Sequence, residues 1–186
     1  MELREQIINA TIDEFQDKGL KFTMNDVAKR IHISKKTMYK VFENKEELFL
    51  AVADYTFAEI KRHEKMILED PSLDLLDKIR RMIIVLPERY KNIGLSNLYP
   101  LQELYPRVYQ RTAQYLETDW DATISLLEQG VREGRLKDLS IPVVKAMVES
   151  TIQHFMASQV LVENGISFEQ GLEKMMDVIM DGMVVR

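Results

Sequence analysis

The chain has 186 residues, and its 30 acidic residues outnumber 25 basic ones, which gives a formal charge of −5. This length favours one domain, or one domain carrying a small second one. With 46% apolar residues, 30% charged residues and no cysteine, the composition excludes a disordered chain, a disulfide scaffold and cysteine-based zinc sites. Neither a membrane-spanning apolar run nor a signal-peptide pattern is present, so we expect a cytoplasmic protein with no membrane contact.

The charge is distributed unevenly along the chain. Residues 18–45 carry eight basic and two acidic side chains, a net of +6, whereas the residues after position 50 carry 16 basic and 21 acidic ones. Such asymmetry indicates a segment that meets an anion, although a solvated basic face would show the same count. The acidic total therefore does not exclude nucleic acid as a partner.

Helical spacing dominates the sequence, and no hairpin turn separates alternating apolar runs. We therefore expect an all-α fold of about nine helices. The first carries Ile8, Ile12 and Phe15 on one face and ends at Gly19, since glycine tolerates the left-handed backbone that often follows a helix. Two short helices are expected over about 25–31 and 35–41.

Longer helices are expected in the remainder of the chain. One begins at Pro71-Ser72 and runs to about residue 86, and a short aromatic-rich segment covers 95–106. An apolar stripe from Tyr109 to Val131, with steps of three and four residues, predicts one long helix stopped by Gly134. The next helix is expected from Ile141 to residues 164–165, and the last over the stripe from 168 to 183.

Three helix-capping sequences follow one another near the N-terminus. Thr23, with Asp26 three residues later, has the form of a capping box, and Ser34 and Asn44 are good N-caps. Only residues 32–34 separate the two short helices, which is the connection length of a helix-turn-helix.

The second short helix has one basic, aromatic face. At about 100° per residue, Lys35, Lys36, Tyr39 and Lys40 lie on one side, and Thr37, Met38 and Val41 lie on the other. Such a face after a tight turn suits a helix that enters the DNA major groove. The alternative is an exposed lysine face on a purely structural helix.

These residues resemble the N-terminal domain of the TetR family of bacterial transcriptional regulators. The resemblance covers about the first fifty residues and rests on Ile7–Thr11 with Phe15 and Gly19, on Thr23–Ala28, on Ile33–Tyr39, and on Phe42 with Asn44–Leu48. It implies a helix-turn-helix DNA-binding domain over 1–48, a helical effector-binding and dimerisation domain over 49–186, and a homodimer on double-stranded DNA.

The resemblance also implies roles for individual residues. Lys35, Lys36 and Tyr39 are expected to reach base edges, with Asn25 as a further candidate; the residues expected to contact phosphates are Thr23, Thr37, Lys40 and Lys45. The sequence departs from the family pattern at two positions. His32 stands where the family usually has glycine, and Val41 stands where it often has a histidine that contacts phosphate.

The C-terminal part contains no catalytic arrangement, so we expect no enzyme, no cofactor and no metal. Glu59 and His63 stand four residues apart and suit an ion pair better than a metal. The last two helices carry broad apolar faces that are expected to form a dimer interface, the alternative being intrachain core; these faces comprise Val144, Met147, Val148, Ile152, Phe155 and Met156, and then Phe168, Leu172, Met175, Ile179 and Met183.

An effector pocket is expected among the middle helices. Its candidate lining residues are Tyr99, Tyr105, Tyr109, Trp120 and Phe155, which suit a small hydrophobic or aromatic molecule unless they belong to the core. The sequence thus predicts a regulator, a repressor released from a palindromic operator when an effector moves the helix that begins at Asn44. A sequence-tolerant DNA-binding protein without an effector remains the alternative, and a helical enzyme a more distant one.

Overall fold

The computed structural model describes residues 2–91 and 100–185. Within these ranges the fold is all-α, as expected: no strand is present, and one isolated bridge joins Leu136 and Val184. Of the α-helices in the described ranges, nine have seven residues or more, and two are single turns of four residues.

The helices group into three sets along the chain. The N-terminal set is α1 (Leu3–Lys18), the 3₁₀ turn η1 (Gly19–Lys21), α2 (Met24–Arg30), α3 (Lys35–Val41) and the long α4 (Lys45–Glu69). The middle set is α5 (Leu75–Ile83), the 3₁₀ turn η2 (Glu88–Tyr90), α7 (Leu101–Leu104), α8 (Pro106–Glu117) and α9 (Asp121–Arg132). The last set is α10 (Ile141–Ala157), α11 (Val160–Glu163) and α12 (Phe168–Met183).

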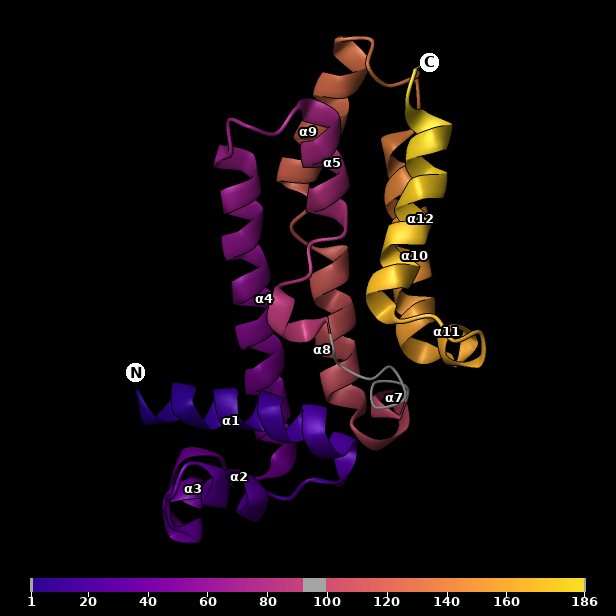
Figure 1. Cartoon of the computed structure of the whole chain (residues 1–186). Helices are drawn as coiled ribbons and strands as arrows, with labels where there is room; N and C mark the ends of the chain where they lie inside the picture. The colour runs from indigo at the N-terminus through magenta and orange to yellow at the C-terminus, as the bar shows by residue number, and fades with distance from the viewer. Residues whose placement is uncertain (1, 92–99, 186) are drawn as a thin grey trace.

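Figure 1 shows how the sets are arranged. Helices α1, α2 and α3 form a unit at one end of the molecule, and α4 runs from that unit along the body. Helix α4 packs on α1 near its start and on α8 further along, while α10 and α12 lie together on the opposite side of the body.

The three predicted caps are present. Thr23 and Asp26 form a full capping box at the start of α2: the Thr23 amide donates to Asp26 Oδ2 at 2.8 Å, and the Asp26 amide donates to Thr23 Oγ1 at 3.2 Å. Hydrogen bonds from Thr23 lower the pKa of Asp26 to about 2, so the box is intact at neutral pH. Ser34 and Asn44 accept from the third amide of α3 and α4, at 3.0 and 2.9 Å.

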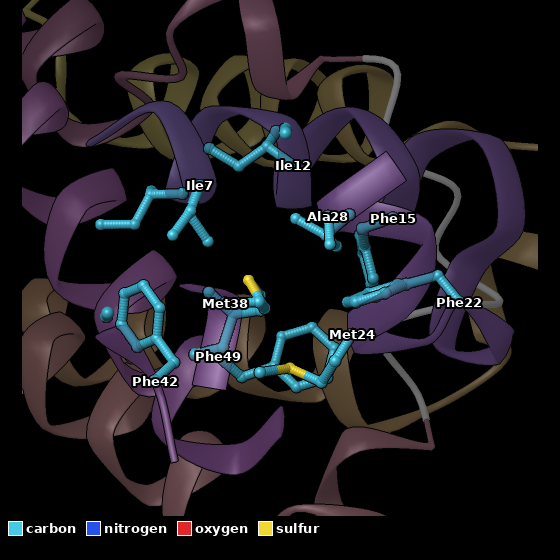
Figure 2. Packing of buried hydrophobic residues seen from close by; sticks show 14 of the residues in the cluster. Ile7, Ile12, Phe15, Phe22, Met24, Ala28, Met38, Phe42 and Phe49 are labelled. Atoms are coloured by element: carbon cyan, nitrogen blue, oxygen red, sulfur yellow. The ribbon is translucent and has the colours of Figure 1, made fainter. Parts of the chain in front are cut away.

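Two hydrophobic cores hold the molecule together. The first joins α1, α2, α3 and the start of α4, and Figure 2 shows its side chains converging from these helices; it includes Ile7, Ile12, Phe15, Phe22, Met24, Ala28, Met38, Phe42 and Phe49. The second joins α5, α9, α10 and α12, with Ile79, Leu127, Val148 and Met176 fully or almost fully buried. Partly buried Leu86 packs against both cores.

The predicted single helix over the stripe from Tyr109 to Val131 is wrong. Helix α8 ends at Glu117 and α9 begins at Asp121, and between them Asp119 adopts a left-handed backbone with φ of 64°. Lys61 of α4 stabilises this break, because its ammonium lies 3.1 Å from both the carbonyl and a carboxylate oxygen of Asp119. The stripe continues across the turn because both helices bury the same side, so periodicity alone did not reveal the break.

Two other helix boundaries differ from expectation. The helix predicted from Ile141 to residues 164–165 stops at Ala157, where Ser158 is extended, and α11 follows as a separate turn. The helix expected at Pro71 begins only at Leu75, because Asp74 caps it by accepting from the Asp77 amide at 2.9 Å. It ends at Ile83.

The turn between α2 and α3 contains the expected backbone constraint. His32 adopts φ of 56°, the left-handed region that glycine occupies without steric cost. The turn is closed by the amides of His32 and Ile33, which donate to the carbonyls of Lys29 and Ala28 at 3.2 and 3.0 Å.

We predict that His32→Gly raises the free energy of unfolding by about 1 kcal/mol, because glycine removes the contact between Cβ and the backbone in a left-handed residue. Urea denaturation of both proteins measures the change. His32→Ala is the matched control and gives no gain, since alanine keeps the Cβ atom. A glycine variant less stable than the parent contradicts this account of the turn.

Candidate DNA interface and internal cavity

Helix α3 is divided into two faces as the sequence predicted. Lys35, Lys36 and Lys40 are exposed, and Tyr39 retains 45% of its surface, whereas Met38 is fully buried in the first core. Val41 packs against that core as well, so the position where the family often has a phosphate-binding histidine contributes here to packing. The helix thus presents a basic, aromatic surface while its other side anchors it.

Most cations of the N-terminal unit that lack an ion pair lie on α2, α3 and the turn before α2; a further one, Arg4 of α1, lies over the Phe42 ring. Lys21, Lys29, Lys35, Lys36 and Lys40 form no ion pair with any of the residues that the structure describes. The other basic groups of this region are engaged within the protein. The Arg30 guanidinium pairs with Glu14 at 2.8 Å and with Asp17, and Lys18 pairs with Glu14 at 2.8 Å.

Lys45 does not have the role that the family resemblance implied. Its ammonium is turned into the protein, where it donates to the carbonyls of Leu20 at 2.6 Å and Phe22 at 2.5 Å. It also lies 4.2 Å from the ring centroid of Phe22 and 5.5 Å from that of Phe49. Burial lowers the pKa of Lys45. The side chain therefore ties the start of α4 to the α1–α2 connection, and a phosphate contact through Nζ is incompatible with this geometry.

The other predicted contact residues differ in their free hydrogen-bond donors. The amide and hydroxyl of Thr23 both donate to Asp26, and the Thr37 hydroxyl lies 2.8 Å from that of Ser34. Asn25 is exposed in the first turn of α2. The DNA contacts of Thr23, Asn25 and Thr37 stay predictions, as do those of the α3 face.

An internal cavity of about 290 Å³ lies where the two cores meet. Phe15, Phe49 and Val108 of the first core line it, and so do Ile83 and Ile152 of the second. Its wall is mostly apolar and is contributed by α1, α4, α5, α8, α9, α10 and α12. Its size is near the lower end of the roughly 300–1,000 Å³ usual for ligand sites.

Of the four predicted pocket residues that the structure describes, one lines the cavity. Trp120 lines it and is held by a hydrogen bond from Nε1 to the Leu116 carbonyl at 2.7 Å. Tyr105 packs on Phe49 instead, with ring centroids 5.0 Å apart. Tyr109 and Phe155 are partly buried and are not among the described residues that line the cavity. Tyr99 lies outside the described residues.

Sequence reasoning missed most of the cavity wall. The largest contribution comes from the inward side of α4, whose members recur every three or four residues: Phe49, Ala53, Phe57, Ile60 and Glu64. Phe57 stacks on Tyr115 of α8 with centroids 4.0 Å apart. The sequence does contain this stripe of α4 at helical spacing, ending on the carboxylate of Glu64. The prediction instead selected aromatic residues in other helices.

The apolar faces of α10 and α12 serve mainly as intrachain core, so their prediction as a dimer interface needs correction. Val144, Val148, Ile152, Leu172, Ile179 and Met183 are all buried within the chain. Met147 of the predicted face is left open, with 54% of its surface exposed, and so are Val143 at 55% and Val178 at 74%. Ala146 and Ser150 line a shallow depression beside Met147.

Glu59 and His63 form neither a metal site nor an ion pair. His63 Nδ1 lies 2.9 Å from the Glu59 backbone carbonyl, while the Glu59 carboxylate pairs with Arg62 and accepts from Tyr90. Across residues 2–91 and 100–185, no three potential metal ligands come together. Within the same ranges, no helix is both long and apolar enough to cross a membrane.

The comparisons with known proteins agree with this architecture. Residues 7–52 match the family model described as bacterial regulatory proteins, tetR family. The HTH-type transcriptional regulator YvaF of Bacillus subtilis is 25% identical over 179 residues, which cover 96% of this chain and 94% of YvaF. The N-terminal part of the chain is thus a TetR-family DNA-binding domain. The chain is a DNA-binding transcriptional regulator, and the relatives that it matches are named as transcriptional regulators.

Solved structures show the same fold along the whole chain. Regulatory protein TetR from Rhodobacter sphaeroides is similar with a TM-score of 0.72 and 18% identity, covering 97% of this chain and 98% of that one. FadR from Bacillus subtilis, solved in complex with stearoyl-CoA, is similar with a TM-score of 0.64 and 19% identity, covering 96% and 98%. The TetR-family fold thus extends beyond the matched N-terminal residues.

We predict that Lys45→Met and Lys40→Met have opposite effects, because only Lys40 is free to neutralise a phosphate. Lys45→Met lowers the free energy of unfolding by about 2 kcal/mol through the loss of hydrogen bonds from a charged donor. It leaves the dependence of DNA affinity on salt unchanged. Lys40→Met makes the slope of log binding constant against log salt concentration about 1 less negative, and it leaves the free energy of unfolding unchanged. DNA titrations at several salt concentrations, with urea denaturation, separate the two; a less negative slope for Lys45→Met contradicts its assignment.

Proposed function

We propose that this TetR-family regulator is a homodimeric repressor that leaves a palindromic operator when a small apolar molecule enters its internal cavity. The observation that carries the proposal is the composition of the cavity wall. Phe15 and Phe49 line the cavity and also belong to the core that holds the helix-turn-helix unit. A ligand that moves this wall acts directly on the packing of α1 against α4.

DNA recognition is assigned to residues 1–48 and, within them, to the exposed side of α3. Lys35, Lys36 and Tyr39 stand where a helix in the major groove meets base edges, and Lys40 is placed for a phosphate. Asn25 at the start of α2 is the further candidate. Because these lysines have no internal ion pairs among the described residues, binding DNA does not require an ion pair to break.

Residues 49–186 are assigned to effector binding and dimerisation. The open side of α10 and α12 offers exposed Val143, Met147 and Val178 next to small residues that allow two helices to approach closely. Two such helices from each protomer form a four-helix interface about a two-fold axis. A two-fold dimer presents two copies of α3 to two half-sites, which is why a palindromic operator follows from this interface.

Helix α4 couples the two functions. Its first turns pack in the first core, and its middle lines the cavity. It has 25 residues and no break, so it is about 37 Å long and moves largely as one body. Outward movement of its middle therefore displaces its start at Asn44, to which Lys45 attaches the α1–α2 connection. The two α3 helices then no longer match half-sites one turn apart.

The effector class follows from the cavity wall, which is largely aliphatic and aromatic. FadR from Bacillus subtilis was solved with stearoyl-CoA, and by this likeness of fold the cavity here takes a molecule with an apolar chain. A cytoplasmic location, where operators are found, is part of the proposal. The second candidate, sequence-tolerant DNA binding without an effector, does not account for a cavity of this size between two cores.

Selection of bound DNA from a random pool tests the operator, and we predict enrichment of one palindrome whose half-site centres lie about 10 base pairs apart or a multiple of that. Lys36→Ala relaxes the preference at one position in each half-site and costs about 1–3 kcal/mol on the selected site alone. Equal losses on selected and random DNA contradict a base contact by Lys36. Enrichment of no sequence supports the sequence-tolerant alternative.

The effector part is tested by filling the cavity. Ala53→Trp puts an indole into the cavity wall, and we predict that it abolishes release of the selected DNA by any added apolar ligand. Ala58→Trp, on the exposed side of the same helix, is the matched control and retains release. Fluorescence anisotropy of labelled DNA measures both variants. Unchanged release in Ala53→Trp places the effector elsewhere.

A further inference from the structure

The charged groups of the cavity wall gather at one end. Among the described residues that line the cavity, the charged ones are Lys61 and Glu64 of α4, Asp119 of the α8–α9 turn and Glu149 of α10. Three of these four are acids. The remaining wall, reaching to Ile12 and Phe15 of α1, is apolar apart from hydroxyl groups. The cavity therefore has a long apolar body and one acidic end.

The one lysine in the described cavity wall is fully engaged. Lys61 Nζ lies 2.6 Å from Glu64 Oε2 and 3.1 Å from both the carbonyl and carboxylate of Asp119. Two carboxylates and a carbonyl around one ammonium leave no cation for an anionic ligand. Burial raises the pKa of Glu64, and its hydrogen bond from Lys61 opposes that rise.

Glu149 contributes an acceptor without a donor. Its Oε1 atom is buried and accepts no hydrogen bond from any described residue. Lys145 Nζ forms an ion pair with this oxygen at 3.4 Å, and the same ammonium donates a hydrogen bond to the Glu117 carbonyl at 3.0 Å. A buried carboxylate oxygen without a donor is costly, so the site favours a ligand that supplies one.

Both carboxylates converge on the same turn. Lys61, the partner of Glu64, binds Asp119, and Lys145, the neighbour of Glu149, binds Glu117 two residues earlier. This places the acidic end beside the α8–α9 break, and Trp120 of that break also lines the cavity. Even with Lys145 counted, three acids face two lysines at this end.

We infer that the effector is an amphipathic amine, whose protonated nitrogen donates to Glu149 and meets the acidic end while its apolar chain fills the body of the cavity. This inference rests on the proposed effector function. It distinguishes the chain from a regulator that binds an anionic head group, because a carboxylate or phosphate at this end meets three acids and a lysine already bound. An alkylammonium with a pKa near that of lysine, about 10.4, is cationic at pH 7.

Three ligands of one chain length test the head group: decylamine, 1-decanol and decanoate, titrated into the full-length protein by calorimetry below their aggregation concentrations. We expect decylamine to bind at least about tenfold more tightly than decanol, as a charged hydrogen bond in a buried site implies, and decanoate to bind most weakly. Of the three ligands, we expect only decylamine to release the selected DNA from the protein at saturating concentration.

Paired variants assign the acceptor. Glu149→Gln reduces the preference for decylamine over decanol about tenfold and leaves decanol affinity unchanged, and Glu64→Gln is a second variant at the same end. Glu163→Gln, exposed on α11, is the matched control and changes nothing. An unchanged thermal midpoint in decanol-bound protein confirms that each variant is folded.

The outcomes separate the inference from the proposed function. Decanol or decanoate binding as tightly as decylamine overturns the amine and leaves an apolar effector intact. Preference for decylamine that survives both Glu149→Gln and Glu64→Gln overturns the assigned end of the cavity. Binding of none of the three ligands overturns the effector cavity itself, and with it the proposed mode of release.

Discussion

The packing of α1 across the start of α4 is the contact on which the rest of the molecule depends. Phe15 and Phe22 from the first helix and the segment after it both meet Phe49 of α4 edge-on, with ring centroids 5.9 and 5.4 Å apart. Lys45 adds two hydrogen bonds across the same junction. Helix α4 continues unbroken from this junction into the cavity wall. Helix α1 is also attached to the body directly, because Arg89 pairs with Asp13 at 3.0 Å and Gln16 donates to the Arg89 carbonyl at 2.6 Å.

The distribution of charge differs between the DNA-binding unit and the body. The chain is acidic as a whole, yet most of the cations left without ion pairs in the described N-terminal residues lie on α2, α3 and the preceding turn. The body is acidic and so is repelled by phosphates, which confines contact to the α3 side. Within the N-terminal unit, Arg30 and Lys18 neutralise Glu14, which keeps a nearly buried carboxylate from weakening that surface.

The sequence predicted those features that local chemistry determines. Thr23, Ser34 and Asn44 act as caps because each needs only the amides of its own first turn. The left-handed His32 was foreseeable from the family resemblance, because His32 stands where the family usually has glycine. The break at Asp119 was not, because Lys61, 58 residues away, stabilises it. Lys45 was misassigned for the same reason: its partners lie on the preceding helix connection, and only tertiary structure brings them into reach.

The same distinction explains the cavity. Aromatic residues are equally suited to a core and to a ligand site, so composition selected Tyr105, which packs against Phe49, along with Trp120, which does line the cavity. The cavity differs from an ordinary core in having two carboxylates in its wall, Glu64 of α4 and Glu149 of α10. Only the folded α8–α9 turn brings these two residues near each other. The exposed face of α3, by contrast, could be predicted from the helical period of that one helix.

The central claim is that a ligand in the cavity moves the DNA-binding unit through α4. The chain has no cysteine, so Lys29→Cys on exposed α2 allows one spin label in each protomer. Pulsed dipolar spectroscopy of this dimer, with selected DNA and then with saturating decylamine, measures the separation of the two units. The account predicts that the separation changes on ligand addition by more than roughly 3.4 Å, the rise along the DNA axis from one phosphate of a strand to the next. An identical distance distribution at a ligand concentration that releases the DNA would contradict it.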